Sequence, residues 1–183
     1  CGYKLPVMLT IIDGYNLLRG AASWGPVKSL GQLNLCELLG RWSVISGHKV
    51  TIIFDGGEPP SGYGRQLQMT GIRVLYSGAG RSADELLIDE IRRCSAPRRL
   101  SVVSADREIR AAARRRRCRE VDPEAFFASM CSRLAASKQH EIRTNEPDTK
   151  RRGLDEGDLH FWLTEFGLTG EDDGMNTDHS ARS

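Results

Sequence analysis

The sequence predicts an α/β protein built on a mostly parallel sheet with helices on both of its faces. Short runs rich in valine, isoleucine and leucine alternate along the chain with longer segments whose apolar residues recur at helical spacing. The short runs are apolar at successive positions, as expected for strands that are covered on both sides. Three of them end on an aspartate. Alternating strands and helices are typical of doubly wound parallel sheets.

The first predicted strand lies in residues 7–16, Val-Met-Leu-Thr-Ile-Ile-Asp-Gly-Tyr-Asn. Its apolar run stops at Asp13, Gly14 permits a sharp turn, and the leucines that follow predict a short helical turn. Asn16 lies one turn beyond Asp13. Ligands bind at the carboxyl ends of the strands in open α/β sheets. Taken alone, Asp13 and Gly14 fit a simple polar turn equally well.

The rest of the chain follows the same alternation. Further predicted strands cover residues 49–55, 72–76, 100–106 and 118–121. Predicted helices cover residues 30–45, 82–93 and 107–116, and another begins at Pro123 with Asp122 as its cap. Polar or glycine-rich connections cover residues 19–29, 56–71 (with one helical turn near 65–69) and 77–81. The second and fourth strands end at Asp55 and Asp106, so parallel pairing would bring three carboxylates to one edge.

The helix predicted from residue 82 opens with Ser-Ala-Asp-Glu. Ser82 and Glu85 fit a capping box, which is the favoured interpretation of Glu85. Asp84 is not needed for that box, although acidic residues are favourable at helix starts because of the helix dipole. Asp84 therefore has both a structural and a functional interpretation.

Length and composition predict one domain with a tail. The 183 residues divide into a folded domain at 1–136, a polar linker at 137–153, an amphipathic segment at 154–168 that docks on the body, and a disordered tail at 169–183. The chain begins with Cys1 rather than methionine, so we expect its natural amino terminus to be incomplete. The net charge of +2 does not by itself indicate a nucleic-acid partner.

The five cysteines are scattered without a Cys-x-x-Cys pair, and the four histidines show no ligand spacing. This pattern favours reduced thiols in a cytoplasmic protein over a disulfide or zinc framework. No apolar stretch is long enough to span a membrane and no signal peptide is visible, so we expect no membrane partner.

The aspartates predict a metal site. Asp13, Asp55, Asp84 and Asp106 would repel one another unless a cation lies between them. Mg²⁺ or Mn²⁺ suits such oxygen ligands and can activate water and neutralise a phosphoryl transition state, as in phosphodiester hydrolysis. Asn16 could hold a water or a metal-bound oxygen without adding charge.

Residues around Asp106 predict contacts to a phosphate backbone. Ser104 and Arg107 flank it and are candidates for the scissile phosphate, or are simply helix-start residues. Tyr15 and Tyr63 are candidate platforms for base stacking. A run of arginines faces only two acids, Asp106 and Glu108, and is either a solvated face or an RNA-binding face. The arginines are Arg98, Arg99, Arg107, Arg110, Arg114, Arg115, Arg116, Arg117 and Arg119.

Four motifs in order, Ile-Asp-Gly-Tyr-Asn, Phe-Asp-Gly, Ser-Ala-Asp-Glu and Val-Val-Ser-Ala-Asp-Arg, resemble the NYN domain over about residues 7–131. The resemblance is to the bacterial ribonuclease branch within the PIN-like superfamily. It implies a three-layer α/β/α fold with strand order 3-2-1-4-5 and a short C-terminal helix, a Mg²⁺ or Mn²⁺ site, and endoribonuclease activity. Carried over by motif, Asp13, Asp84 and Asp106 bind metal, and Asn16 and Asp55 support them. The implied partner is RNA, single-stranded or presented on a ribosome, and the oligomeric state is left open.

Three other classes compete with this interpretation. A haloacid-dehalogenase phosphatase needs a second aspartate two residues after the first, where this chain has Tyr15. A Rossmann nucleotide-binding domain needs a glycine fingerprint that Gly14 alone does not supply. A non-catalytic RNA-binding or adaptor protein with a PIN-like fold is the serious rival, because a fold can persist without the activity.

Overall fold

The computed structural model describes residues 8–23, 30–59 and 70–145. Within these residues, parallel strands form one sheet in the order β3-β2-β1-β4-β5. The strands are β1 (Leu9–Asp13), β2 (Lys49–Phe54), β3 (Arg73–Tyr76), β4 (Leu100–Val103) and β5 (Arg119–Val121). The predicted α/β class and strand order are confirmed.

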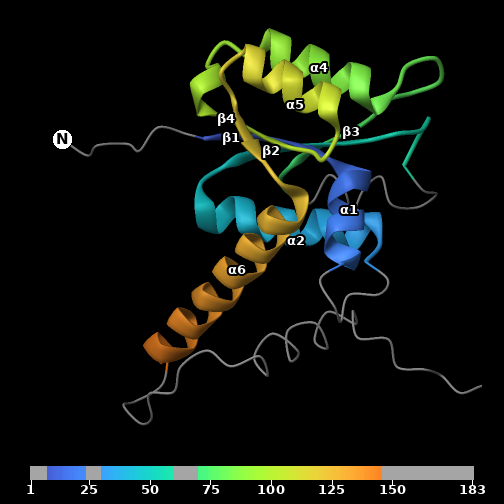
Figure 1. Cartoon of the computed structure of the whole chain (residues 1–183). Coiled ribbons are helices and arrows are strands. Elements are labelled where there is room, and N and C mark those ends of the chain that lie inside the picture. Colours follow the sequence, from blue (N-terminus) through green and yellow to red (C-terminus); the bar gives the residue numbers. More distant parts are fainter. Residues whose placement is uncertain (1–7, 24–29, 60–69, 146–183) are drawn as a thin grey trace, which may run out of the picture.

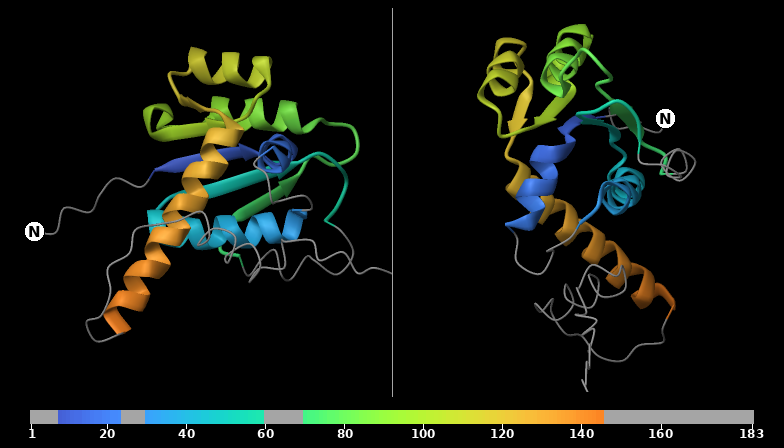
Figure 2. Two further views of the ribbon diagram at one scale, coloured as in Figure 1. Left: turned by 60° about the horizontal axis from the view of Figure 1, so that its bottom comes forward. Right: turned by 90° about the vertical axis from the view of Figure 1, so that its right-hand side faces the viewer.

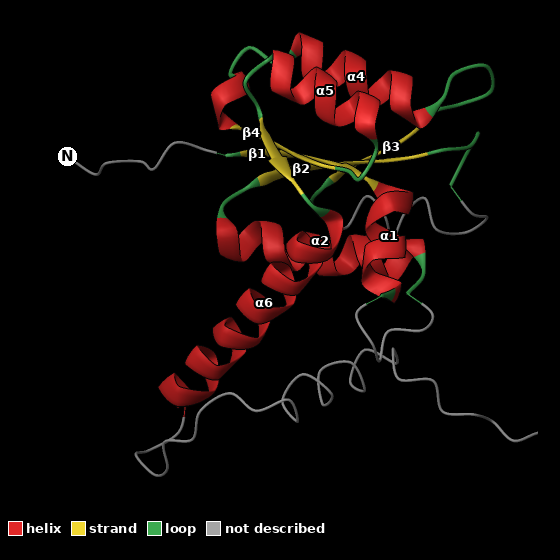
Figure 3. Cartoon of the chain, in the orientation of Figure 1, coloured by secondary structure: helices red, strands yellow, loops and turns green. Residues whose placement is uncertain are grey.

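Helices cover both faces of the sheet and complete a three-layer arrangement (Figure 1). On one face lie α1 (Gly14–Ala22), α2 (Gln32–Ser46) and α6 (Pro123–Asn145). On the other face lie α4 (Ala83–Arg93) and α5 (Arg107–Arg115). The two further views in Figure 2 show the same division between the faces. Figure 3 shows that strands and helices alternate from β3 to α6, with η1 (Pro97–Arg99) before β4.

Each face of the sheet has its own hydrophobic core. Ile12, Phe54 and Phe127 belong to the core under α1, α2 and α6. Ile53 and Leu87 belong to the core under α4 and α5. Neighbouring β2 residues thus enter opposite cores, because successive side chains of a strand point to opposite faces. Each fully buried side chain of this size contributes about 1.5–3 kcal/mol, so both helical layers are held firmly to the sheet.

The strand pairing fixes which residues meet at the carboxyl edge of the sheet. In β1, Asp13 pairs with Ile53 of β2, and Ile12 pairs with Val103 of β4. The chain order of the strands reverses at β1, which is where ligands bind in sheets of this type. Asp13 therefore ends the central strand at the switch point between β1 and β4.

Three predicted boundaries were wrong. Strand β4 ends at Val103 rather than Asp106, because Asp106 has left the sheet and caps α5. Helix α1 continues to Ala22, so the first part of the predicted connection 19–29 is helical. Helix α6 continues to Asn145, so the linker predicted from residue 137 begins as helix. That segment consists mostly of residues with good or moderate helix propensity, which a reading based on polarity alone missed.

Several predictions lie outside the described residues. They are the helical turn near 65–69, Tyr63, residues 146–153 of the linker, the segment 154–168 and the tail 169–183. Within the described part of the chain, no helix is long and apolar enough to cross a membrane.

Candidate active site

Asp13 is the most buried acid of the predicted cluster, with 5% of its surface exposed. Its Oδ1 accepts a hydrogen bond from the Asn16 backbone N–H at 3.0 Å, which caps α1. Its Oδ2 accepts hydrogen bonds from the Asn16 side-chain amide and from Ser104 Oγ, the latter at 3.2 Å. A buried carboxylate needs such donors to remain charged. Asn16 therefore holds Asp13 in place through both its backbone and its side chain.

Gly14 allows Asp13 to sit where it does. A Cβ at Gly14 would collide with the ring of Phe54 and come within 3.0 Å of the Ile53 carbonyl oxygen. The backbone of α1 thus approaches β2 more closely than any residue with a side chain would permit. Gly14 is the first residue of α1 and is not among the glycines with positive φ, so the predicted need for conformational freedom is not what the position requires. The requirement is space beside Phe54.

Asp55 joins the end of β2 to the start of α4. Its Oδ1 accepts hydrogen bonds from Ser77 Oγ at 2.7 Å and from the Ala83 backbone N–H at 3.2 Å. Ser77 Oγ also accepts a hydrogen bond from the Gly56 N–H at 3.1 Å. Asp55 therefore positions the first turn of α4, which carries Asp84.

Asp84 faces the other acids from the first turn of α4. Ser82 and Glu85 make the hydrogen bonds of the capping box, so Asp84 is not needed to cap α4. The residue as a whole is exposed, but partial burial of its carboxyl group raises the pKa above the usual value. The negative charges of Asp106, Asp13, Asp55 and Glu108 raise this pKa further. The acids predicted from separate motifs therefore lie within one another's electrostatic field.

Ser104 links Asp13 to Asp106. It is 1% exposed, and its Oγ donates to Asp13 Oδ2 while accepting the backbone N–H of Asp106 at 3.0 Å. Asp106 Oδ1 accepts the N–H groups of Glu108 and Ile109 at 2.7 and 3.1 Å, which makes Asp106 the cap of α5. The burial of Ser104 is at odds with its predicted contact to RNA. Its observed role is to position two acids.

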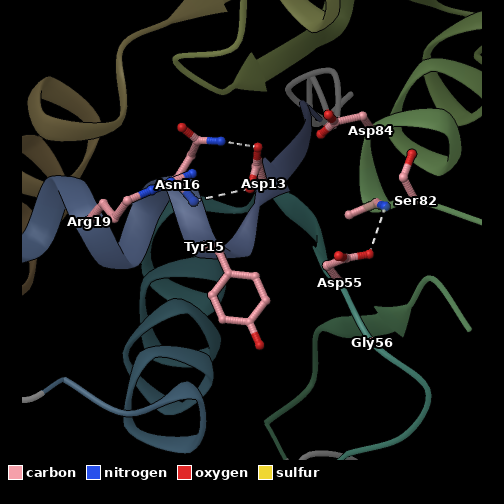
Figure 4. A pocket seen from close by; sticks show the side chains of 9 residues that line it. Asp13, Tyr15, Asn16, Arg19, Asp55, Gly56, Ser82 and Asp84 are labelled. Atoms are coloured by element: carbon pink, nitrogen blue, oxygen red, sulfur yellow. Dashed lines mark hydrogen bonds between the residues drawn. The ribbon is translucent and has the colours of Figure 1, made fainter.

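Part of the predicted acidic set borders a cleft of about 460 Å³ (Figure 4). Asp106 and Ser104 are not among the residues that line it. Asp13, Asp55 and Asp84 line it from three different elements. Arg19 also lines it from the last turn of α1 and is exposed. Sequence reasoning missed Arg19, although its spacing of three residues from Asn16 places both on one face of a helix. A cation in this position can attract the phosphates of a polyanion into an otherwise acidic cleft.

Tyr15 also lines the cleft and is 41% exposed. Its hydroxyl accepts a hydrogen bond from Gln32 Nε2 at 2.9 Å, and Gln32 Oε1 accepts one from the Tyr76 hydroxyl at 3.0 Å. Its ring also packs edge-on against Phe54, with centroids 5.6 Å apart. The ring is thus held from two sides while part of it faces solvent, as a stacking platform requires.

Two of the predicted RNA-binding arginines are paired within the protein. Arg110 and Arg114 hold the carboxylate of Glu120 on β5 at 3.2 and 2.9 Å. The hydrogen bond from Arg114 lowers the Glu120 pKa to about 2, with a further contribution from Arg110. Glu120 offsets one of their two positive charges, a pairing that the sequence prediction did not foresee because Glu120 ends the run. Arg107 is exposed next to Asp106.

The chemistry of the donor set fits a hard divalent cation. The cluster offers only carboxylate oxygens, with the Asn16 amide beside them, and these are the ligands of Mg²⁺ and Mn²⁺. As they are placed, the described residues include no group of three or more His, Cys, Asp or Glu side chains close enough to hold an ion.

A five-stranded parallel sheet in the order 3-2-1-4-5, with helices on both faces and an acidic cleft near its switch point, defines a doubly wound α/β domain. Residues 10–162 match the family described as the YacP-like NYN domain, and the chain belongs to that family.

Two solved structures of Rae1 (YacP) from Bacillus subtilis have a similar fold. The structure of a mutant form has a TM-score of 0.58 at 13% identity, covering 90% of this chain and 93% of that one. The second structure of Rae1 (YacP) has a TM-score of 0.58 at 14% identity, covering 87% of this chain and 90% of that one. At this level of identity the likeness supports the fold alone. No curated protein matches the chain in sequence.

Proposed function

We propose that this protein is a metal-dependent endoribonuclease that hydrolyses single-stranded RNA in the cleft bordered by Asp13, Asp55 and Asp84. The observation that carries the proposal is the cleft itself, because Asp13 at the end of β1, Asp55 after β2 and Asp84 in the first turn of α4 all line it. Partial burial and the neighbouring acids raise the pKa of Asp84, which agrees with this crowding. A fold gains no stability from repulsion between like charges, so the gathering of these acids in one cleft favours a functional purpose. Membership of the YacP-like NYN family supports RNA as the substrate.

Asp13, Asp84 and Asp106 would hold the metal ion, which is Mg²⁺ or Mn²⁺. When bound, such an ion lowers the pKa of water and offsets the charge that develops on a phosphoryl group. Asp13 is the fixed member of the set, because three hydrogen bonds orient its carboxylate before any ligand arrives. Asp55 keeps Asp84 in reach by anchoring the start of α4.

Arg19 and Tyr15 would position the substrate. Arg19 would bind a phosphate next to the bond that is cut, since a guanidinium matches phosphate oxygens in charge and geometry. Tyr15 would stack with an unpaired base, a contact that a base inside a duplex cannot make. Together they favour an unpaired strand in the cleft. The free thiols of Cys36, Cys94, Cys118 and Cys131 fit a reducing compartment, the cytoplasm, as the site of action.

The decisive experiment compares the wild type with Asp13→Asn on a labelled single-stranded RNA, with Mg²⁺ or Mn²⁺ and with a chelator. Asparagine keeps the cap of α1, because Asn and Asp cap helices about equally well. We expect internal cleavage by the wild type, none with the chelator, and a loss of at least about 100-fold in Asp13→Asn, in line with removing a group that stabilises the transition state.

Circular dichroism and thermal melting serve as the control for folding of Asp13→Asn. If the wild type binds RNA but never cuts it under any metal condition, the protein is a non-catalytic RNA-binding or adaptor protein. Cleavage at the wild-type rate by folded Asp13→Asn would remove Asp13 from the chemistry.

A further inference from the structure

The edge of the sheet opposite the cleft carries a cluster of arginines. Parallel strands start at this amino edge, and α4 and α5 end there. Arg119 of β5 pairs with Ser101 of the neighbouring strand β4. Arg117 and Arg99 lie two residues before these partners, so both come just before their strands at the same edge of the sheet. We define the amino-edge cluster as Arg98, Arg99, Arg115, Arg116, Arg117 and Arg119, all of them exposed.

The cluster is separated from the cleft by the length of α5. This helix follows its cap Asp106, beside the acidic set, and runs for 9 residues from Arg107 to Arg115. At 1.5 Å per residue its two ends are about 13 Å apart. Figure 1 shows α4 and α5 side by side across the sheet, and Arg116 Nη2 donates to the Cys94 carbonyl oxygen at 2.7 Å between their carboxyl ends. These arginines therefore cannot touch the phosphate that is cut.

The charge of the cluster is not neutralised within the described residues. The acids of α4 and β5 that form ion pairs do so with arginines outside the cluster. Glu120 pairs with Arg110 and Arg114, Glu90 pairs with Arg73, and Asp89 pairs with Arg81 and Arg92. From residue 91 to 105 and from 109 to 119 the sequence contains no acid at all. A concentrated positive field of this kind attracts a polyanion.

The neighbourhood of the cluster indicates how that polyanion would be bound. The segments that carry it, residues 94–99 and 115–119, contain no Phe, Tyr or Trp. Single-stranded RNA is held mainly by stacking on such side chains, whereas duplex RNA is bound through its phosphates and 2′-hydroxyl groups. The cleft has Tyr15, whereas the segments of the cluster supply guanidinium groups and no Phe, Tyr or Trp, so the two surfaces suit different forms of RNA.

We propose that the amino-edge cluster is a second RNA-binding surface that holds the phosphate backbone of a base-paired segment, while an unpaired strand occupies the cleft. This rests on the proposed function for RNA as the ligand. It adds the prediction that the preferred substrate combines a duplex with a single-stranded extension.

The test measures binding in EDTA to three RNA probes: a 20-base-pair duplex with a single-stranded extension, the blunt duplex, and the extension alone. The variant carries Arg98→Gln, Arg99→Gln, Arg117→Gln and Arg119→Gln. The matched control removes the same charge from ion-paired arginines, through Arg73→Gln, Arg81→Gln, Arg110→Gln and Arg114→Gln. Thermal melting verifies that both proteins fold.

We expect the cluster variant to bind both duplex probes at least about 10-fold more weakly, and its plot of log affinity against log salt to flatten by about 2 to 3 ion equivalents. Binding of the extension alone should change less than about threefold, and the control should stay within the same limit. Equal losses in both variants would mean that only total charge matters and would overturn the proposal. So would an unchanged affinity for the duplexes.

These readouts are independent of catalysis. A protein that binds the duplex through the cluster but never cleaves RNA would refute the proposed function and leave the second surface intact. If the wild type cleaves the extension but the cluster variant binds duplexes normally, the proposed function stands and the second surface is refuted.

Discussion

The two edges of one sheet carry opposite charge, and the same helices connect them. Helices α4 and α5 begin among Asp84 and Asp106 and end among arginines. Both arrangements are locally favourable, because helix amino termini prefer acids and carboxyl termini prefer bases. The difference lies in how the charges are held. Asp13, Asp55 and Asp106 accept hydrogen bonds from the protein, whereas most of the cluster arginines are simply exposed. Acids held by hydrogen bonds suit chemistry, and exposed arginines suit the attraction of a polyanion.

The largest effect in this comparison is expected from Asp106→Ser. Serine caps a helix about as well as aspartate, so α5 should keep its start and the melting temperature should change little. Removing the charge from the acidic edge should lower cleavage by at least about 100-fold. Single-turnover cleavage and thermal melting measure the two effects separately. A fully active, equally stable variant would mean that Asp106 only caps the helix.

Asp84→Asn should lower cleavage and raise the concentration of Mg²⁺ needed for half-maximal rate. Its folded pKa lies above the unfolded value, so the charged form destabilises the fold once the pH rises above the unfolded value of 3.8. The variant should therefore melt at the same or a slightly higher temperature at pH 7, with no difference near pH 3. A lower melting temperature at pH 7 together with unchanged metal dependence would assign Asp84 to the helix start alone.

Arg19→Gln should weaken substrate binding by about tenfold, the loss expected for one charge-assisted hydrogen bond to phosphate. We expect KM to rise while kcat changes little, for short and long RNA alike. This distinguishes Arg19 from the amino-edge cluster, whose replacement should spare short single strands. Arg41→Gln, on the exposed side of α2 and outside the cleft, provides a matched control.

Glu120→Gln should have the smallest effect. The pKa of Glu120 is lowered to about 2, mainly by the hydrogen bond from Arg114, so its stabilising contribution is present above the unfolded value of 4.5. That contribution disappears as the pH falls from about 5 towards 2. A surface pair of this kind contributes at most about 1 kcal/mol. Urea unfolding at pH 7, 4 and 3 should show the difference in unfolding free energy between wild type and variant becoming smaller as the pH falls. A constant difference would mean that the charge of Glu120 is not the source of the stabilisation.

Much of the fold was predictable because its signals are local. Apolar runs, the Ser82–Glu85 capping box and the helix after Asp122 depend on residues that are close in the sequence. The family motifs added the strand order. The end of β4 was missed because Ser104 looks like a strand residue, and only its bond to Asp13, 91 positions away, shows that it has left the sheet.

The site was predictable as a set of acids but not as an arrangement. Their order along the chain and the parallel sheet gave the common edge. Arg19 and the pairing of Glu120 with two arginines needed three-dimensional contacts, because nothing in their immediate sequence marks them. The distance between the arginines and the cleft also followed only from the direction in which α5 runs.

The hydroxyl of Ser104 has a consequence for the stereochemistry of the reaction. Its single proton is committed to Asp13, its oxygen already accepts from Asp106, and it is buried. It is therefore unsuited to attack phosphorus and carry a covalent phosphoserine. Displacement by water in one step should invert the configuration at phosphorus. An RNA with a chiral phosphorothioate at the cut, hydrolysed in isotopically labelled water, should yield the inverted product, and net retention would require a covalent acceptor elsewhere in the cleft.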